Sequence, residues 1–438
     1  MAICLVVVSF LMPLFSRELR KTGSIMFGYW FVIFLHQIVA FLNVYLLAIK
    51  KRGTFGASDD ANQGFHRVAK ELALHGATTF RDQELSVPLS LNSLMKGGPF
   101  YYEMLGTVYQ WFGASLLLGE QLSILAFVLS CIVFLKIMRQ LGSERYSFSA
   151  LICFGALPSM VFLGSITLRE SFEVFFFMLT VYLGVRISMK RKFKIGSVLL
   201  MAMSAFLMGV FHKALVVYAV FMIFIFLIWS YRPISRLGSI KKLHLMAMIV
   251  APLFFLCIVV VLGENYVAFA LIKELQVGAS LEQLVMGWRE SSLSLQGRTS
   301  YDISLNPSSP LTLFFSGLKI YGYYIFGGFS WRFDNFVDAY ATVEAILRLI
   351  LISFSVLGWW KAVGLQKRLL GLMLFLYISM SFMWAMGTTN YGTAMRHHML
   401  TWWITVILGV PPLMATLNRF WSGRMRRYRD SSDKILHG

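Results

Sequence analysis

Charged residues are scarce in this chain. Only 14% of its 438 residues are Asp, Glu, Lys or Arg, whereas soluble proteins contain about one quarter. Hydrophobic residues reach 58%, more apolar surface than a water-soluble fold of this length can bury. The four cysteines, Cys4, Cys131, Cys153 and Cys257, all lie inside apolar runs. This position argues against disulfides between aqueous loops and against a cysteine-rich metal site.

Several nucleotide and nucleic-acid signatures are also missing. The sequence has no Walker A string, no G-x-G-x-x-G, no G-x-S-x-G and no zinc-finger spacing. A net charge of +19 would suggest nucleic acid in a soluble protein, but in a membrane protein it reflects basic cytoplasmic loops facing anionic lipid. We therefore expect membrane lipids, and no nucleic acid, as partners.

The main feature of the sequence is a series of long apolar runs. They predict an all-α, polytopic integral membrane protein. Runs of about 17–25 residues mark transmembrane helices, and about eleven are predicted here. They lie at about 2–16, 24–48, 119–138, 148–166, 171–189, 195–211, 214–230, 245–263, 341–360, 369–386 and 399–417. The first run lacks a preceding basic region and a small-residue cleavage site, so it is interpreted as a span and not as a removed signal peptide.

The distribution of lysine and arginine predicts the orientation. Most of them fall in short segments that a cytoplasmic C-terminus places inside: 17–21, 136–145, 186–194, 232–242, 361–368 and 419–434. Most carboxylates fall on the other side. The cluster at 50–52 is the exception, and snorkelling or contact with lipid phosphate would explain it. The predicted location is a bacterial inner membrane, crossed many times, with the working face periplasmic.

Two extracytoplasmic loops are long, at about 50–118 and 264–340, and loops of this length are usually functional. The aromatic stretches 100–118 and 321–331 are predicted to be interfacial helices, with Tyr101, Tyr102, Tyr109 and Trp111 at headgroup level. The chain is divided accordingly into a membrane module with the first long loop (1–263), the second long loop (264–340), and the last spans with a basic tail (341–438).

The first candidate for chemistry is the acidic pair Asp59 and Asp60, about ten residues beyond the second span. Such a pair suits a general base acting on a hydroxyl, or a ligand set for a divalent ion, Mg²⁺ or Mn²⁺. The structural alternative is an N-cap for the amphipathic helix that starts at Ala61. Asp60 could both cap and catalyse.

Two further polar segments lie on the same face. Arg169 and Glu170 stand in a tight turn between two spans, where the guanidinium could bind a phosphate or form a local ion pair. The segment 388–398 contains Asn390, Arg396 and His397, which suit phosphate or sugar contact or plain interfacial anchoring. Adjacent histidines point apart on a helix, so they do not form a catalytic zinc site.

The remaining polar residues are weaker candidates for a functional site. The second long loop carries aromatic residues beside acids and cations, among them Arg298 and Trp331, a combination that can hold sugars but also occurs in interfacial belts. His36, Gln37 and Asn43 lie inside the second span, where polar groups more often bridge helices than catalyse.

Together these features resemble polytopic bacterial type C glycosyltransferases that use polyprenyl-phosphate-linked donors. The resemblance rests on Asp60, Phe65 and His66 in the first large outside loop and on the aromatic helix after it. It rests also on Pro158 in a later span and on the L-R-E-S string at 168–171. The N-x-G-T-A-x-R-H string at 390–397 is similar to membrane proteins of O-antigen and exopolysaccharide assembly.

The resemblance implies a mechanism. Asp60, or Asp59 beside it, would deprotonate an acceptor hydroxyl, which would displace polyprenyl phosphate from the anomeric carbon with inversion. The leaving phosphate would be neutralised by arginines: Arg169, Arg298 and Arg396. The implied substrate contacts are His66, Glu170, Tyr101, Trp331, Asn390 and His397. No cofactor is obligatory, and assistance by a divalent cation stays open.

The implied partners are a polyprenyl-phosphate-linked sugar, a glycan or lipid-linked acceptor, and other polysaccharide-assembly proteins. One alternative is a repeat-unit polymerase for O-antigen, capsule or exopolysaccharide, in which both substrates are lipid-linked oligosaccharides. The alternative from another class is a flippase for such lipids, although the sequence has no matching halves and its acids cluster outside the spans. A scaffold would not need two long charged loops.

Overall fold

The computed structural model describes residues 1–47, 60–75, 99–189, 195–230, 300–327 apart from 302 and 307, and 336–436. Within these ranges the chain is helical, and its β-structure is an isolated bridge between Ser300 and Asn390. The all-α prediction is therefore confirmed for this part of the chain. The predicted span at 245–263 lies outside it, as do Asp59, Arg298 and Trp331.

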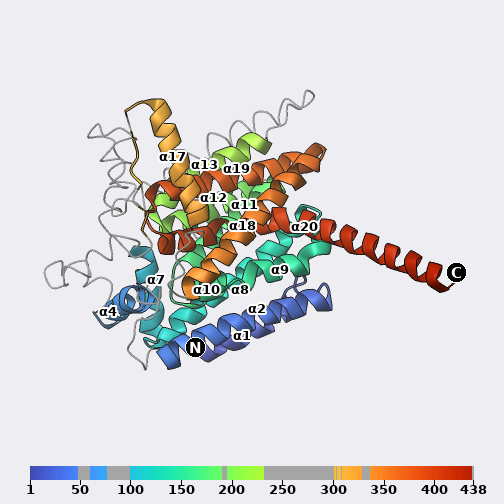
Figure 1. The fold of residues 1–438 in the computed structure, drawn as a ribbon. Coiled ribbons are helices and arrows are strands. Elements are labelled where there is room, and N and C mark those ends of the chain that lie inside the picture. The colour runs from blue at the N-terminus through green and yellow to red at the C-terminus, as the bar shows by residue number, and fades with distance from the viewer. Residues whose placement is uncertain are drawn as a thin grey trace.

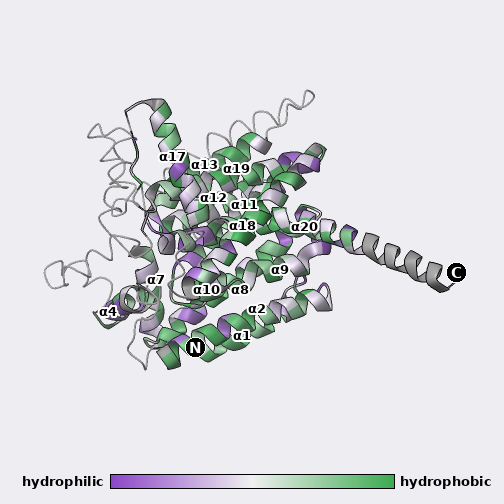
Figure 2. Cartoon of the chain, viewed as in Figure 1, coloured by the Kyte–Doolittle hydropathy of each residue, from purple (hydrophilic) through white to green (hydrophobic). Residues whose placement is uncertain are grey.

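The principal helices are long and largely apolar (Figures 1 and 2). They are α1 (Ala2–Phe15), α2 (Gly23–Leu42) with η1 (Asn43–Leu47), α8 (Leu116–Gln140), α9 (Ser147–Gly155), α10 (Pro158–Ser165), α11 (Glu170–Met189), α12 (Ile195–Phe211), α13 (Lys213–Ser230), α18 (Phe336–Lys361), α19 (Gly364–Gly387) and α20 (Tyr391–Leu436). The other helices are η2 (Asp60–His66), α4 (Arg67–His75), α7 (Pro99–Phe112), η3 (Glu144–Tyr146) and α17 (Pro310–Phe326).

Six helices in the described residues are long and apolar enough to cross a membrane, or seven if α9 and α10 count as one bent span. They are Gly23–Leu46, Leu116–Gln140, Glu170–Met189, Asp338–Lys361, Gly364–Gly387 and Tyr391–Ser422, and each overlaps a predicted span. The runs at the N-terminus, 195–211 and 214–229 form apolar helices that are shorter. The described residues thus support a membrane protein with fewer full-length spans than the eleven expected.

The surface of α2 is apolar on the side away from the bundle. Phe27, Phe34 and Leu42 are 63%, 54% and 46% exposed, while His36 and Gln37 of the same helix are buried. Large exposed hydrophobic patches are unusual on soluble monomers. An apolar exterior around buried polar groups is instead what a bilayer favours, because lipid cannot satisfy polar side chains.

The centre of the bundle is formed by α11, which packs against α8, α12 and α13, and by α20, which packs against α18 and α19. Helices α1 and α2 form one edge and contact α8 (Figure 1). The small helix α4 packs on α7 at the end of the bundle opposite to the C-terminal extension of α20 (Figure 1). The first turns of α8 and α11 lie near α7, and the start of α20 meets the first turn of α11.

The predicted span 148–166 is broken. Helices α9 and α10 meet at an angle of 67°, and Pro158 is the first residue of α10, the helix position at which proline is best tolerated. The backbone N–H of Ser159 donates to the Glu344 carboxylate at 2.9 Å. Glu344 on α18 thus satisfies a free N–H at the break.

The aromatic stretch after the first long loop forms α7, but its tyrosines do not face outward. Tyr101, Tyr102 and Tyr109 are buried, and only Trp111 is largely exposed, at 73%. The tyrosines lie against protein because α4 and α12 pack on α7. Three of the four rings thus contact protein and not the surroundings, and their place at headgroup level stays a prediction.

Candidate functional site

The second and third polar segments of the sequence meet in space. Glu170 is the first residue of α11, and Arg396 lies in the second turn of α20. The Nε and Nη2 atoms of Arg396 donate to Glu170 Oε1 at 3.0 and 2.6 Å. A charge-assisted contact of this kind is strong when it is shielded from water. Two residues separated by 226 positions thus form the centre of the candidate site.

Arg169 completes this centre. Its Nε lies 3.2 Å from Glu173 Oε1, one helical turn along α11. Its guanidinium carbon lies 5.8 Å from the centre of the Phe65 ring, within the range of a cation–π contact. Arg169, Glu170, Glu173 and Arg396 are named here the charge quartet. The Phe65 contact brings the first polar segment to it.

Tyr101 of α7 stands beside the quartet. Its ring meets those of Phe65 and Phe172, with centroids 5.3 and 5.8 Å away. Burial raises the pKa of the Tyr101 hydroxyl well above its usual value, more than Arg169 lowers it. The hydroxyl therefore stays protonated and can donate a hydrogen bond.

His66 pairs with a second tyrosine of α7. Its Nδ1 lies 2.8 Å from the Tyr109 hydroxyl. Burial, and then the positive charge of Lys70, lowers the pKa of His66 from 6.5 to about 4. Burial likewise raises the pKa of Tyr109. At neutral pH both groups are uncharged, so this pair can exchange hydrogen bonds with a hydroxyl without adding charge.

Two other predicted substrate contacts, His397 and Asn390, lie close to Arg396 in the sequence but make different bonds. Nδ1 of His397 lies 2.9 Å from the Thr388 hydroxyl, and its ring stacks on Trp384 with centroids 3.9 Å apart. Asn390 accepts a hydrogen bond from the backbone N–H of Thr393 at 2.7 Å. Asn390 therefore caps α20, while His397 follows Arg396 and has its ring against Trp384.

Of Asp60, the residue expected to act as the base, the structure describes the backbone alone. Asp60 is the first residue of η2, which ends at His66, so its backbone begins the same helix that presents Phe65 to Arg169. Its side chain, with Asp59, Arg298 and Trp331, lies outside the described residues. Among the residues described, no group of three His, Cys, Asp or Glu side chains could hold a metal ion.

Sequence reasoning missed four buried charged residues. Glu173 is 1%, Glu120 0%, Glu344 3% and Arg348 4% exposed. Arg348 donates to the carbonyl of Ile325 at 3.0 Å. The signal that could have found them is a charge inside an otherwise apolar span, which usually marks function.

The polar residues of the second span bridge helices, as predicted. The Gln37 and Gln121 amides exchange two hydrogen bonds of 2.9 and 2.8 Å. Asn43 Nδ2 donates to Glu120 Oε1 at 2.5 Å. His36 approaches the Val32 carbonyl at 2.9 Å and stacks on Phe127. The amide pair and the Asn43–Glu120 bond fix α2 and η1 to α8, whereas the His36–Val32 contact lies within α2.

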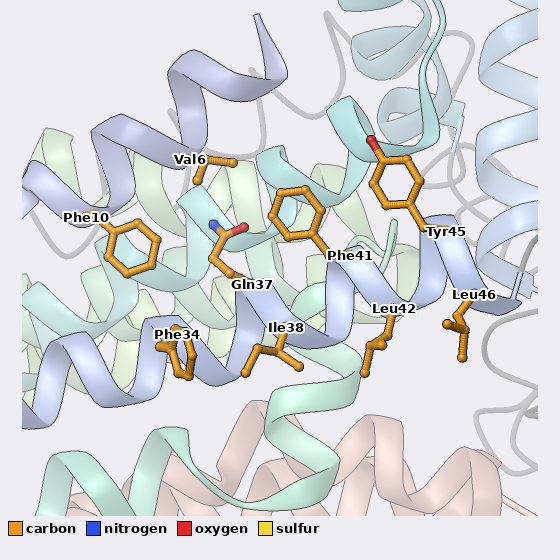
Figure 3. A pocket seen from close by; sticks show the side chains of 9 residues that line it. All are labelled: Val6, Phe10, Phe34, Gln37, Ile38, Phe41, Leu42, Tyr45 and Leu46. Carbon is orange, nitrogen blue, oxygen red and sulfur yellow. The ribbon is translucent and has the colours of Figure 1, made fainter.

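An open apolar groove of about 460 Å³ runs along α2 (Figure 3). Phe34, Phe41 and Tyr45 line it from α2 and η1, and Val6 and Phe10 line it from α1. The groove reaches the end of α2 at which Asn43 bonds to Glu120. A hydrocarbon chain fits such a lining, because burying it adds no unsatisfied polar group.

The chain matches no protein-family model, no curated protein and no solved structure.

Proposed function

We propose that this protein is a membrane glycosyltransferase that moves a sugar from a polyprenyl-phosphate-linked donor to a glycan or lipid-linked acceptor. The observation that carries the proposal is the convergence of the three polar segments. Arg169 contacts Phe65 of the first segment and Glu173, and Arg396 of the third segment pairs with Glu170. Buried charge gathered from distant segments is a common property of catalytic sites.

The proposed reaction is a displacement with balanced proton and electron movement. Asp60, with Asp59 as the alternative, takes the proton of the acceptor hydroxyl. The acceptor oxygen then bonds to the anomeric carbon as the bond from that carbon to the phosphate oxygen breaks. The polyprenyl phosphate leaves with the bonding electrons. A positioned carboxylate typically contributes a factor of about 10²–10⁴ to such a step.

Arg169 and Arg396 are the proposed partners of the leaving phosphate, and Arg298 would join them from the second long loop. The two described arginines already pair with Glu173 and Glu170. These carboxylates hold the guanidinium groups in place before the substrate arrives. Preorganised charge of this kind stabilises a developing anion without reorganisation.

The groove along α2 is the proposed seat of the donor's hydrocarbon tail (Figure 3). Its apolar lining suits an isoprenoid chain, and tail binding would hold the phosphate in line with the acceptor. In this proposal the quartet faces the periplasm of a bacterial inner membrane and the basic segments face the cytoplasm.

The proposal is tested by glycan analysis of cells that carry wild-type protein, Asp60→Asn or Asp59→Asn at matched membrane abundance. We expect the product to disappear with Asp60→Asn and to persist with Asp59→Asn. If the product disappears with Asp59→Asn and persists with Asp60→Asn, the base is Asp59. Identical products from all three and from a strain without the gene would contradict the transferase proposal.

A repeat-unit polymerase is the first alternative, and the same strains separate it from single-sugar transfer. Loss of the long-chain ladder on a gel indicates polymerisation. A ladder of normal length with an altered sugar composition indicates single-sugar addition.

The broken helix favours a second candidate, a flippase for lipid-linked sugars. Broken helices with buried charges near the break are typical of transporters, and here Glu344 caps α10 while Arg348 lies one turn further along α18. Reconstituted vesicles with a fluorescent polyprenyl-phosphate sugar test it. Transbilayer movement without sugar transfer would favour the flippase.

A further inference from the structure

Glu120 is a fully buried carboxylate in the second turn of α8. Its Oε1 accepts the bond from Asn43, but its Oε2 has no hydrogen-bond partner in the described part of the chain. A buried polar atom without a partner is costly, and in native structures it calls for an explanation such as a bound group.

Two hydroxyls lie against the Cα of the preceding residue, Gly119, which has no side chain. A Cβ on Gly119 would stand 2.7 Å from the Tyr109 hydroxyl and 2.8 Å from Thr167 Oγ1. Thr167 Oγ1 is also buried without a partner. The Tyr109 hydroxyl is the one that contacts His66, and it feels the charge of Glu120. One open hydroxyl and one neutral pair therefore lie against Gly119, and the open oxygen of Glu120 belongs to the next residue of the helix.

We infer that Glu120, Thr167 and the Tyr109–His66 pair form a subsite that recognises a hydroxyl group of the transferred sugar. The inference rests on the proposed function and deepens it. A sugar hydroxyl both donates and accepts. It can donate to the open oxygen of Glu120 while it accepts from the Thr167 or Tyr109 hydroxyl.

The position of the subsite fits this role. Thr167 precedes Arg169 by two residues, and Tyr101 and Tyr109 lie two turns apart on α7. The subsite therefore flanks the quartet, so a ring held there would have its anomeric phosphate near Arg169. A site built to bond a substrate hydroxyl discriminates strongly against an analogue that lacks it, because its own polar groups are then left unpaired.

Glu120→Gln tests the inference sharply. The amide keeps an oxygen for Asn43 and replaces the open acceptor with a donor. The matched control is Thr180→Val, which removes another fully buried hydroxyl, bonded to Ser204, and leaves the subsite and the groove intact. Thr167→Val, which deletes one hydroxyl at constant shape, is the second test variant.

The probes are farnesyl-phosphate-linked glucose, galactose and mannose, followed by the monodeoxy derivatives of the hexose that the wild type uses. We expect Glu120→Gln and Thr167→Val to lower kcat/KM for the parent hexose by about 10- to 100-fold, mainly through KM. The control should change it less than threefold. For one monodeoxy derivative the loss should vanish, because the hydroxyl that meets Glu120 is absent.

The outcomes separate the two proposals. If the wild type transfers sugar and Glu120→Gln lowers kcat/KM equally for every derivative, or for none, the subsite is overturned. The transferase proposal then stands. Absence of transfer from every hexose by the wild type contradicts the transferase, and with it the subsite. A penalty that disappears for a single derivative supports both.

Discussion

The two ends of the helical bundle treat charge differently. At the end with the quartet, Arg396 and Glu170 are 17% and 5% exposed, and Arg169 and Glu173 are 12% and 1% exposed. At the opposite end, where α8 finishes and η3 begins, Arg139 and Glu18 are 50% and 10% exposed, and Lys21 and Glu144 are 44% and 34% exposed. Both members of each ion pair are shielded from water at the quartet end, whereas the cation of each pair at the opposite end is about half exposed.

The difference has a physical consequence for stability and for function. Exposed pairs contribute about 0–1 kcal/mol each, so the chain could lose those at the opposite end with little effect. Buried pairs are costly to desolvate, and apolar residues would often replace them without loss. The described ion pairs with both members shielded lie at the quartet end, and charge kept in this costly place indicates a functional role there.

The largest expected effect comes from breaking one pair at each end. Arg396→Met leaves Glu170 buried without its partner and should lower the free energy of unfolding by about 3–5 kcal/mol. Arg139→Met should lower it by about 1 kcal/mol or less, because Arg139 is half exposed. Denaturant unfolding in mixed micelles measures both. Equal losses would contradict the comparison.

A smaller effect is expected from adding a methyl group beside the quartet. Gly119→Ala places a Cβ within 2.8 Å of Thr167 and Tyr109 atoms and should cost about 1–3 kcal/mol by overpacking. Gly196→Ala, a helical glycine on α12 with nothing within 4 Å, should be neutral or stabilise by up to about 1 kcal/mol. Thermal unfolding in detergent distinguishes them, and the reverse order would show that the packing around Gly119 is loose.

A third effect is a pH dependence of stability at the quartet end. Since the pKa of His66 is lowered from 6.5 to about 4, the unfolded chain takes up this proton first. The stability from His66 is therefore complete above pH 6.5 and is lost as the pH falls towards 4. His66→Gln should flatten this part of the unfolding midpoint curve. Lys70→Met should narrow the pH window, and curves identical to wild type would show that His66 is not buried.

The sequence predicted the helical membrane character well, because a long apolar run such as 119–138 has few alternatives to a helix. The broken span was harder to predict. Pro158 marks the break, but the carboxylate that accepts from the Ser159 N–H there belongs to Glu344, 185 positions away. The short runs, including 195–211, form helices whose lengths do not by themselves define a span.

The site was predicted in its segments but not in its contacts. Arg169 stands next to Glu170 in the sequence, yet it pairs with Glu173, because residues four apart share a helix face and neighbours do not. Glu170 is left for Arg396, a choice made by the packing of α11 on α20. Glu120 lies inside the predicted span 119–138, and a charge inside an apolar run was the available signal.

The most direct test of the account is sugar transfer by the double variant Glu170→Leu with Arg396→Met. Replacing both members of a buried pair with apolar residues should restore the stability lost in Arg396→Met, to within about 1 kcal/mol of wild type. The measurement is product formed per folded protein in membranes, relative to wild type. The account predicts a stable protein that transfers no detectable sugar. A stable double variant with wild-type transfer would contradict the account and show that the Glu170–Arg396 pair has a structural role alone.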